Sequence, residues 1–209
     1  MALSDRETHW DQVYQTRSPD EVSWYQRDPA LSLNFIRRAV PSLSASIVDV
    51  GSGASTLVDH LLQSGYSDVT VLDVSTAALE LARARLAEAS LCVRWIAGDV
   101  LWAPLPDAAF DLWHDRAVFH FLTDDKDRVV YLKQVRRTLR PRGSVVIATF
   151  ADDGPTRCSG LPVARYSADA LRAEFGREFE LVDSAREQHV TPAGLTQSFV
   201  YCLFRRRGA

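Results

Sequence analysis

The stretch Ser46-Ile-Val-Asp-Val-Gly-Ser-Gly-Ala-Ser55 decides the fold of this chain. Its first five residues are mostly apolar and β-branched, which is typical of a strand buried inside a parallel sheet. Gly51 and Gly53 follow this strand, and a helical segment is predicted from Thr56 to Gln63. The stretch therefore predicts a strand, a tight glycine turn and a helix, the unit from which nucleotide-binding α/β sheets are built.

The glycine turn is suited to lie against a ligand. Without side chains at Gly51 and Gly53 the backbone can approach a bound group, and the N-terminus of the following helix favours negative charge. A dinucleotide fingerprint needs a third glycine, but Thr56 occupies its position, which weakens a pyrophosphate interpretation. Asp49, directly before the turn, can instead pair with the ammonium group of a ligand.

Strand and helix signals alternate along the rest of the chain. Strands are predicted at 69–74, 92–96, 110–114, 144–150, 179–187 and 197–204, and helices at 75–89, 125–139 and 168–175. Strands separated by helices imply a parallel sheet with right-handed crossovers. The last two strands have no helix between them and should form an antiparallel pair at one edge. The predicted fold class is α/β.

The composition is that of an ordinary globular protein. The chain has 209 residues, a net charge of −3 and a hydrophobic fraction of 46%, which gives no nucleic-acid footprint. No apolar stretch is long enough to cross a bilayer, and the three cysteines form no C-x-x-C pair that would predict a zinc site or a disulfide framework. We expect one domain over 1–209, with an aromatic arm at 1–44 and an α/β core at 45–209. We also expect a cytoplasmic location, no membrane or nucleic-acid partner and no metal; the oligomeric state is open.

Two more acids follow the next predicted strands. Asp73 could accept hydrogen bonds from both hydroxyls of a ribose, or it could merely help to cap the helix that begins near Ser75. Asp99 could face an adenine amino group. Because the carboxyl ends of parallel strands meet at one edge of a sheet, Asp49, Asp73 and Asp99 together predict a ligand site there.

Five segments resemble, in order and spacing, the motifs of the class I S-adenosylmethionine-dependent methyltransferases. They are Asp49-Val-Gly-Ser-Gly53, Leu72-Asp-Val-Ser75, Gly98-Asp-Val100, Phe110-Asp-Leu112 and Leu139-Arg-Pro-Arg-Gly143. One departure is Ser55, where many members carry a third glycine. The resemblance implies a Rossmann-like sheet of seven strands, with helices on both faces, and S-adenosylmethionine as cofactor. The cofactor residues that it implies in the core are Asp49, Gly51, Ser52, Gly53, Asp73, Val74, Asp99 and Val100.

The aromatic arm resembles the segments with which many small members of this family cover the active site. Aromatic faces near a sulfonium attract its positive charge, and a closing arm keeps water out. Trp24 and Tyr25 are therefore predicted to contact the cofactor. The alternative is that the arm's aromatic residues only pack it onto the sheet.

Methyl transfer from a sulfonium is an in-line displacement, so alignment and exclusion of water matter most, and a base is needed only for a protonated acceptor. In the family, the segment after the fourth strand borders the methyl group. The predicted catalytic residues are His114, Asp115, His120 and Tyr14, although His120 could belong to a packing helix. The predicted substrate contacts are Arg116, Phe119, Cys158, Arg165, Tyr166 and His189.

The leading functional prediction is methyl transfer to a small molecule, namely a thiol, a chalcogen species or an amine. The segment after the fourth strand lacks the Asn/Asp-Pro-Pro-Tyr/Phe motif, which argues against a nucleic-acid substrate. Protein lysine methylation is the nearest alternative: an open groove would favour it, whereas a closed pocket would favour a small molecule. Two alternatives from other classes are an NAD-dependent oxidoreductase and a catalytically silent cofactor-binding partner protein.

Overall fold

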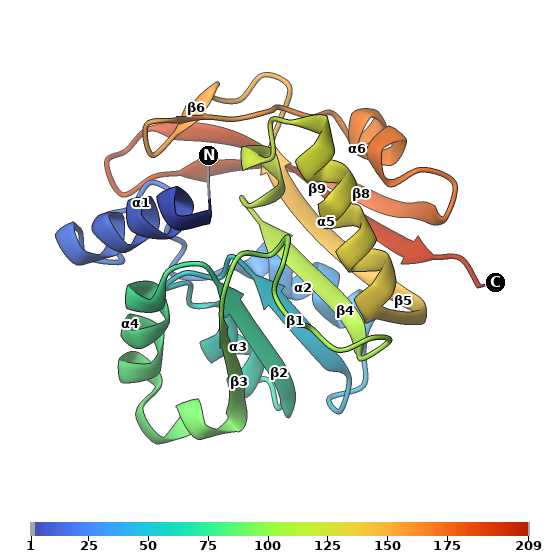
Figure 1. The fold of residues 1–209 in the computed structure, drawn as a ribbon, viewed down its shortest axis with the longest axis horizontal. Coiled ribbons are helices and arrows are strands. Elements are labelled where there is room, and N and C mark those ends of the chain that lie inside the picture. The colour runs from blue at the N-terminus through green and yellow to red at the C-terminus, as the bar shows by residue number, and fades with distance from the viewer. Residues whose placement is uncertain (1–2, 209) are drawn as a thin grey trace.

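The computed structural model describes residues 3–208 and contains a sheet of seven strands in the order β3-β2-β1-β4-β5-β9-β8 (Figure 1). Five strands run parallel to one another: β1 (Ser46–Val50), β2 (Asp68–Asp73), β3 (Val93–Ala97), β4 (Phe110–Arg116) and β5 (Leu139–Phe150). The last two strands, β8 (Phe179–Val190) and β9 (Thr196–Arg206), form the antiparallel edge pair. The predicted fold class and the predicted edge hairpin are confirmed.

Helices cover both faces of this sheet. On one face lie α2 (Ala30–Ala39), α3 (Leu57–Gln63) and α4 (Thr76–Leu86). On the other face lie α5 (Asp125–Thr138) and α6 (Ala168–Phe175). Each face therefore has its own buried apolar layer, as the near-continuous apolar sequence of β1 requires.

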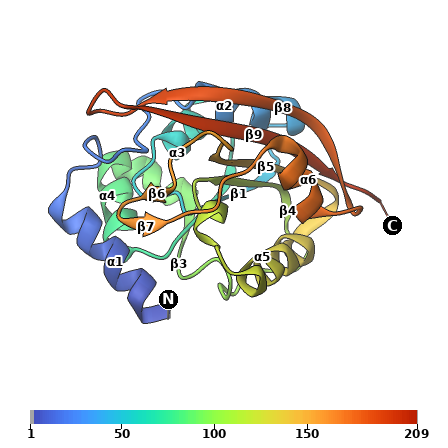
Figure 2. The same cartoon turned by 90° about the horizontal axis from the view of Figure 1, so that it is seen from above.

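The remaining elements gather near the carboxyl ends of the parallel strands. Helix α1 (Leu3–Thr16) lies against α4, and the short hairpin of β6 (Arg157–Cys158) and β7 (Leu161–Pro162) lies at the same edge (Figure 2). Two short 3₁₀ segments, η1 (Ala87–Cys92) and η2 (Phe119–Phe121), follow α4 and β4. No helix among residues 3–208 is long and apolar enough to cross a membrane.

Local sequence explains where several helices begin. The Ser75 hydroxyl accepts a hydrogen bond from the Ala78 amide at the start of α4, and Ser167 does the same for Ala170 at the start of α6. Asp124 caps α5 through the Lys126 amide. Each side chain satisfies an amide that has no partner within its own helix.

The arm at 1–44 differs from a simple cover. Its second half forms α2, which packs on the sheet over β4 and β5 with Phe35 and Ile36 buried. This half is therefore a helix of the core, and only the segment before it can act as a cover. Pro19 and Pro29 lie in the segment between α1 and α2. Neither proline therefore interrupts a helix.

Candidate active site

A cavity of about 110 Å³, which we call the main cavity, lies at the carboxyl ends of β1 to β4. Its floor is built from the strand ends and the glycine turn, namely Gly51, Leu72, Asp73, Val74, Gly98, Asp99 and Val100. Side chains from α1, the arm, η2 and β6 close it from above. A side cavity of about 40 Å³ lies on the other side of the glycine turn, and Asp49, Ser52, Tyr25 and His114 line it.

The glycine turn needs glycine at both predicted positions. Gly51 and Gly53 have φ of +60° and +54°, in the left-handed region that other residues rarely adopt. A Cβ added at Gly51 would lie 1.8 Å from Cγ2 of Val118, and one at Gly53 would lie 2.1 Å from the Tyr14 hydroxyl. Thr56, in place of a third fingerprint glycine, donates its hydroxyl to the Gln26 carbonyl at 2.8 Å and ties the arm to the turn.

Asp73 supports the turn and also lines the main cavity. Its Oδ2 accepts the Gly53 amide at 2.6 Å, and its Oδ1 accepts the Ser75 amide at 2.7 Å. Burial raises the pKa of Asp73 to about 6, although these two amides oppose the shift. A carboxylate has about four acceptor sites, so two remain for the hydroxyls of a ribose. The two interpretations of Asp73 therefore do not exclude each other.

Asp99 is held from the N-terminal helix. Its Oδ1 accepts the Leu101 amide at 2.9 Å, and its Oδ2 accepts Nη1 of Arg6 at 2.9 Å. Arg6 also forms an ion pair with Asp127 at the start of α5. One arginine of α1 thus bridges the end of β3 and the start of α5, and it occupies the carboxylate that the resemblance assigns to adenine.

Two further contacts fix α1 over the sheet. Asp11 accepts the Ser75 hydroxyl at 2.6 Å and the Ala77 amide at 3.2 Å. The hydroxyl of Tyr14 lies over Gly53, close enough that a Cβ there would overlap it. Arg6 and Asp11 were not predicted from the sequence, because charged residues in a polar helix show no pattern that separates a site contact from a solvated face.

Replacing Arg6 by alanine is expected to loosen α1 without unfolding the sheet. The change removes two partly buried ion pairs, whereas Asp11 and Tyr14 keep their contacts. Hydrogen exchange followed by mass spectrometry should show faster exchange in peptides from 5–16 and unchanged exchange in β1 and β4. Arg172→Ala is the matched control, because its ion pair with Asp169 lies on the surface of α6. Unchanged exchange in α1 would contradict the anchoring role of Arg6.

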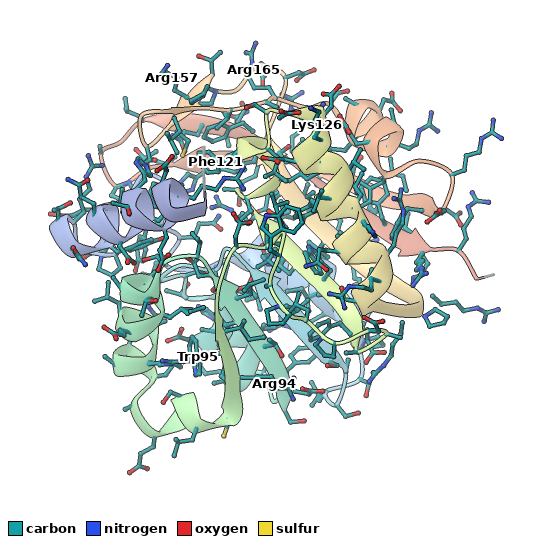
Figure 3. The ribbon with its side chains drawn as sticks, viewed as in Figure 1. Arg94, Trp95, Phe121, Lys126, Arg157 and Arg165 are labelled. Carbon is teal, nitrogen blue, oxygen red and sulfur yellow. The ribbon has the colours of Figure 1, made fainter. Side chains whose placement is uncertain are left out.

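Aromatic side chains form one wall of the main cavity. Trp10 meets Trp24 edge to face at 5.5 Å between ring centroids, and it meets Phe121 at 5.2 Å. Trp24 donates its indole N–H to the Tyr14 hydroxyl at 3.2 Å. Figure 3 labels Phe121 between α1 and the β6–β7 hairpin. Trp24, which is predicted to contact the cofactor, lines the main cavity, and so does Phe121, which was not predicted because an aromatic residue in a 3₁₀ segment looks like core.

The structure does not bring together the histidines and the acid of β4 and η2, namely His114, Asp115 and His120. His114 lines the side cavity and contacts Asp49. Asp115 lines neither cavity; it is fully buried and accepts the Val118 amide and the Tyr131 hydroxyl. His120 is also fully buried and accepts the Phe150 amide at Nδ1, while burial lowers its pKa to about 3. The structure therefore does not support a direct catalytic role for Asp115 or His120.

Burial also sets the pKa of the Asp115 carboxyl, which rises to about 6 although the Tyr131 hydroxyl opposes the shift. Successive side chains of a strand point to opposite faces of the sheet. His114 is thus directed toward α2, whereas Asp115 is directed toward α5. There the Asp115 carboxylate accepts the Val118 amide of the turn that leads into η2.

Of the six predicted substrate residues, Arg116 and Cys158 line the main cavity. The Arg116 guanidinium lies 4.3 Å from the centroid of the Phe199 ring and donates to the Trp24 carbonyl at 2.9 Å. Burial raises the pKa of the Cys158 thiol to about 11. The other four lie elsewhere. Phe119 and Tyr166 belong to the core, Arg165 points into solvent (Figure 3), and His189 lines an open groove beside the arm.

No group of three or more histidine, cysteine or carboxylate side chains within 3–208 is arranged to hold a metal ion. The polar side chains of the two cavities include carboxylates, hydroxyls and guanidinium groups, together with the Cys158 thiol in the main cavity and the His114 imidazole and Gln26 amide in the side cavity. Four buried side-chain oxygens have no hydrogen-bond partner within the described residues, and two of them belong to the side cavity, namely Asp49 Oδ2 and Ser52 Oγ. Both residues line the side cavity, and unpartnered buried oxygens at a cavity indicate that a ligand is to be bound there.

Comparison with known proteins points to one family. A family model described as a methyltransferase domain matches residues 47–143. The chain is 23% identical over 196 residues to EEF1A lysine methyltransferase 2 of Homo sapiens, covering 87% of this chain and 77% of that protein. It is 30% identical over 122 residues to an uncharacterised methyltransferase of Mycobacterium tuberculosis, covering 58% of each chain.

A solved structure shares the fold over most of the chain. It is the 1,6-didemethyltoxoflavin-N1-methyltransferase of Burkholderia thailandensis, described with 1,6-didemethyltoxoflavin and S-adenosylhomocysteine bound. The TM-score is 0.68 at 22% identity, and the match covers 98% of this chain and 87% of that one. At this identity the likeness concerns the arrangement of the sheet and its helices.

Proposed function

The chain belongs to the class I S-adenosylmethionine-dependent methyltransferases, and we propose that its acceptor is a small molecule that arrives as a thiolate or a related chalcogenolate. S-adenosylmethionine, when bound, supplies a methyl group on a positively charged sulfur. The protein has to hold the donor, align the acceptor and exclude water. The side chains that line the main cavity determine which acceptor suits it.

The residues of both cavities fit this donor. The free oxygens of Asp49 and Ser52 suit its ammonium group, and the two remaining acceptor sites of Asp73 suit its ribose hydroxyls. The glycine turn leaves space that a Cβ at Gly51 or Gly53 would fill. Trp10 and Trp24 offer aromatic faces on the cavity side, which favour a positively charged sulfur.

One observation carries the proposal on the acceptor: among the described residues, the main cavity offers no free base, because Asp73, the one carboxyl there whose pKa is raised toward neutrality, already accepts two backbone amides and is assigned to the ribose. The cavity contains no histidine. Burial raises the pKa of Cys158 to about 11 and raises that of Tyr14 still further. Asp73 and Asp99 are the carboxylates in the lining, and both already accept hydrogen bonds from the protein.

An acceptor in this cavity therefore has to be nucleophilic as it arrives. A thiol has an unperturbed pKa of about 8.5, so a few per cent is ionised at neutral pH, whereas an amine of pKa about 10.4 remains almost entirely protonated. The two cations of the lining, Arg6 and Arg116, also disfavour an ammonium group. Among the predicted acceptors, thiols and their selenium relatives fit best.

The shape of the cavity supports a small acceptor. Helix α1 crosses its mouth and is anchored at Arg6, Asp11 and Tyr14. The volume of about 110 Å³, which the acceptor shares with the donor, suits a compact group rather than a segment of folded protein. Closure of this kind also protects the donor from hydrolysis.

The test is the pH dependence of methyl transfer to thiols of different acidity, with the donor saturating. Below the pKa of each thiol, kcat/KM is expected to rise about tenfold per pH unit and then to level off, because the fraction of thiolate follows that ionisation. The inflection should shift with the thiol, from an aromatic to an alkyl one. Cys158→Ala is the control and should keep the same inflections. A fixed inflection for all thiols, or faster turnover with amines, would contradict the proposal.

Protein lysine methylation is the second candidate, and two observations favour it. One is the match to EEF1A lysine methyltransferase 2 over 87% of this chain. The other is an open groove of about 710 Å³ beside the arm, lined by acidic side chains that include Asp20, Asp28 and Glu187, which suit a basic segment. Radiolabelled donor incubated with a cell extract separates the candidates, since label in protein supports lysine methylation and label in extractable small molecules supports the thiol proposal.

A further inference from the structure

Only one of the two carboxylate oxygens of Asp49 has a hydrogen-bond partner among the described residues. Asp49 is 2% exposed, and its Oδ1 lies 2.6 Å from Nδ1 of His114. Its Oδ2 has no partner among residues 3–208, and Asp49 lines the side cavity. Burying a carboxylate is costly unless both of its oxygens are satisfied. We therefore expect the unpartnered oxygen of Asp49 to be the one that contacts a ligand.

The His114 ring is held on both of its nitrogens. Nδ1 faces Asp49, and Nε2 lies 3.0 Å from the Ser32 hydroxyl of α2. A carboxylate oxygen only accepts hydrogen bonds, so Nδ1 carries the proton toward Asp49. The hydroxyl of Ser32 can then donate to Nε2 and fix this tautomer.

His114 is therefore poorly placed to take a proton from an acceptor. It is 2% exposed, it is not among the residues of the main cavity, and both ring nitrogens are engaged. What the ring does is to fix the plane of the Asp49 carboxylate. A hydrogen bond from a fixed ring to one oxygen orients the other oxygen, as outer partners do for ligating side chains in metal sites.

We propose that His114 and Ser32 are positioning residues that hold Asp49 so that its free oxygen binds the ammonium group of the donor. This inference rests on the donor assigned above but is independent of the acceptor. The role is electrostatic: one buried carboxylate is oriented toward one cation, and no bond is made or broken at His114. It replaces the catalytic role that the sequence predicts for this histidine.

The test compares two ligands that differ in the amino-acid part. S-adenosylhomocysteine carries the ammonium group, whereas 5′-methylthioadenosine has the same nucleoside and sulfur but lacks it. By calorimetry, His114→Phe is expected to weaken binding of S-adenosylhomocysteine about 10- to 100-fold, the scale of a hydrogen-bonded charged group, and to leave binding of methylthioadenosine unchanged. Equal weakening of both ligands, or of neither, would overturn the proposal.

Two more variants keep the test decisive if the phenylalanine variant does not fold. His114→Asn retains an N–H near the place of Nδ1 and should recover part of the selective loss. Ser32→Ala removes the partner of Nε2, together with a hydrogen bond between Ser32 and Tyr201, and should show a smaller loss with the same selectivity. Thr138→Val is the matched control, because it removes a buried hydroxyl that bonds the Gln134 carbonyl in α5; it should leave both affinities unchanged.

The tautomer can be observed without any ligand. Nitrogen-15 NMR of the His114 ring in the free protein is expected to show a protonated Nδ1, and a proton on Nε2 alone would overturn the proposal. Failure of the thiol proposal would leave these results unchanged. Loss of S-adenosylmethionine binding by the wild-type protein would instead show that the donor assignment itself fails.

Discussion

Replacing Gly51 by alanine is expected to destabilise the chain by about 2–5 kcal/mol and to remove measurable cofactor binding. The backbone there has φ of +60°, which costs a residue with a Cβ about 1–2 kcal/mol. The added Cβ would also lie 1.8 Å from Cγ2 of Val118, and relieving such an overlap in a packed interior costs about 1–3 kcal/mol. The turn then has to move away from the main cavity.

Thermal unfolding and calorimetry with S-adenosylmethionine measure the two effects. Gly194→Ala is the control, because Gly194 has φ of +78° and no atom within 4 Å of an added Cβ. It should show the backbone cost alone and normal cofactor binding. Adding Val118→Ala to the Gly51 variant should restore part of its stability, since it removes the atom that overlaps. If Gly51→Ala and Gly194→Ala lose the same amount of stability, the close approach of Val118 has no energetic consequence.

Replacing Asp73 by asparagine is expected to weaken S-adenosylmethionine binding about 10- to 100-fold at neutral pH. Three interactions change together. An amide group cannot accept hydrogen bonds from both Gly53 and Ser75, and it offers the ribose hydroxyls a less favourable partner than a carboxylate does. Asp111→Asn is the matched control, since Asp111 accepts the Ser46 amide at the opposite edge of the sheet; its cofactor affinity should remain normal.

The pH dependence of binding distinguishes the Asp73 carboxylate from other contacts. Burial raises the pKa of Asp73 from 3.8 to about 6, so the carboxyl takes up a proton as pH falls below about 6. The wild-type affinity should therefore fall about tenfold between pH 7 and pH 5, and Asp73→Asn should abolish most of that dependence. An unchanged pH profile in the variant would show that another group controls it.

The same shift affects folding with a defined sign. Between about pH 4 and pH 6 the folded chain binds a proton at Asp73 that the unfolded chain has lost. The contribution of this group to the free energy of unfolding therefore falls as pH rises through that window, and the cost is fully present above it. Burial of the ionised Asp73 carboxylate thus lowers the free energy of unfolding, whereas the same ionised form is the one that favours ligand binding.

The fold was predictable because each strand of the sheet has a simple local pattern. The apolar β1, the turn at Gly51 and the serine cap of α4 are local features, and the structure places them as expected. The start of β5 was predicted at 144, but the strand begins at Leu139 because of an irregular register opposite Phe110 and Leu112. An irregularity of this kind depends on the partner strand, which the local sequence does not reveal.

The site was predictable where it follows from the strand ends and unpredictable where it depends on packing. Asp73 and Asp99 lie at the main cavity because parallel strands end at one edge. Asp115 and His114 are neighbours in sequence, yet one caps a turn and the other orients Asp49. Which neighbour faces which helix depends on the helices above and below the sheet. Arg6 became part of the site only through the docking of α1, a long-range contact that has no local signal.

The two sides of the main cavity have different origins in the chain. The donor side comes from the ends of β1, β2 and β3, whereas Trp10, Phe121 and Cys158 come from α1, η2 and β6, which lie outside the seven-stranded sheet. Substitutions in these outer segments alter the surface that meets an acceptor without disturbing strand pairing. The scaffold can thus diversify its chemistry through mutations that its stability tolerates, while its methyl donor stays the same.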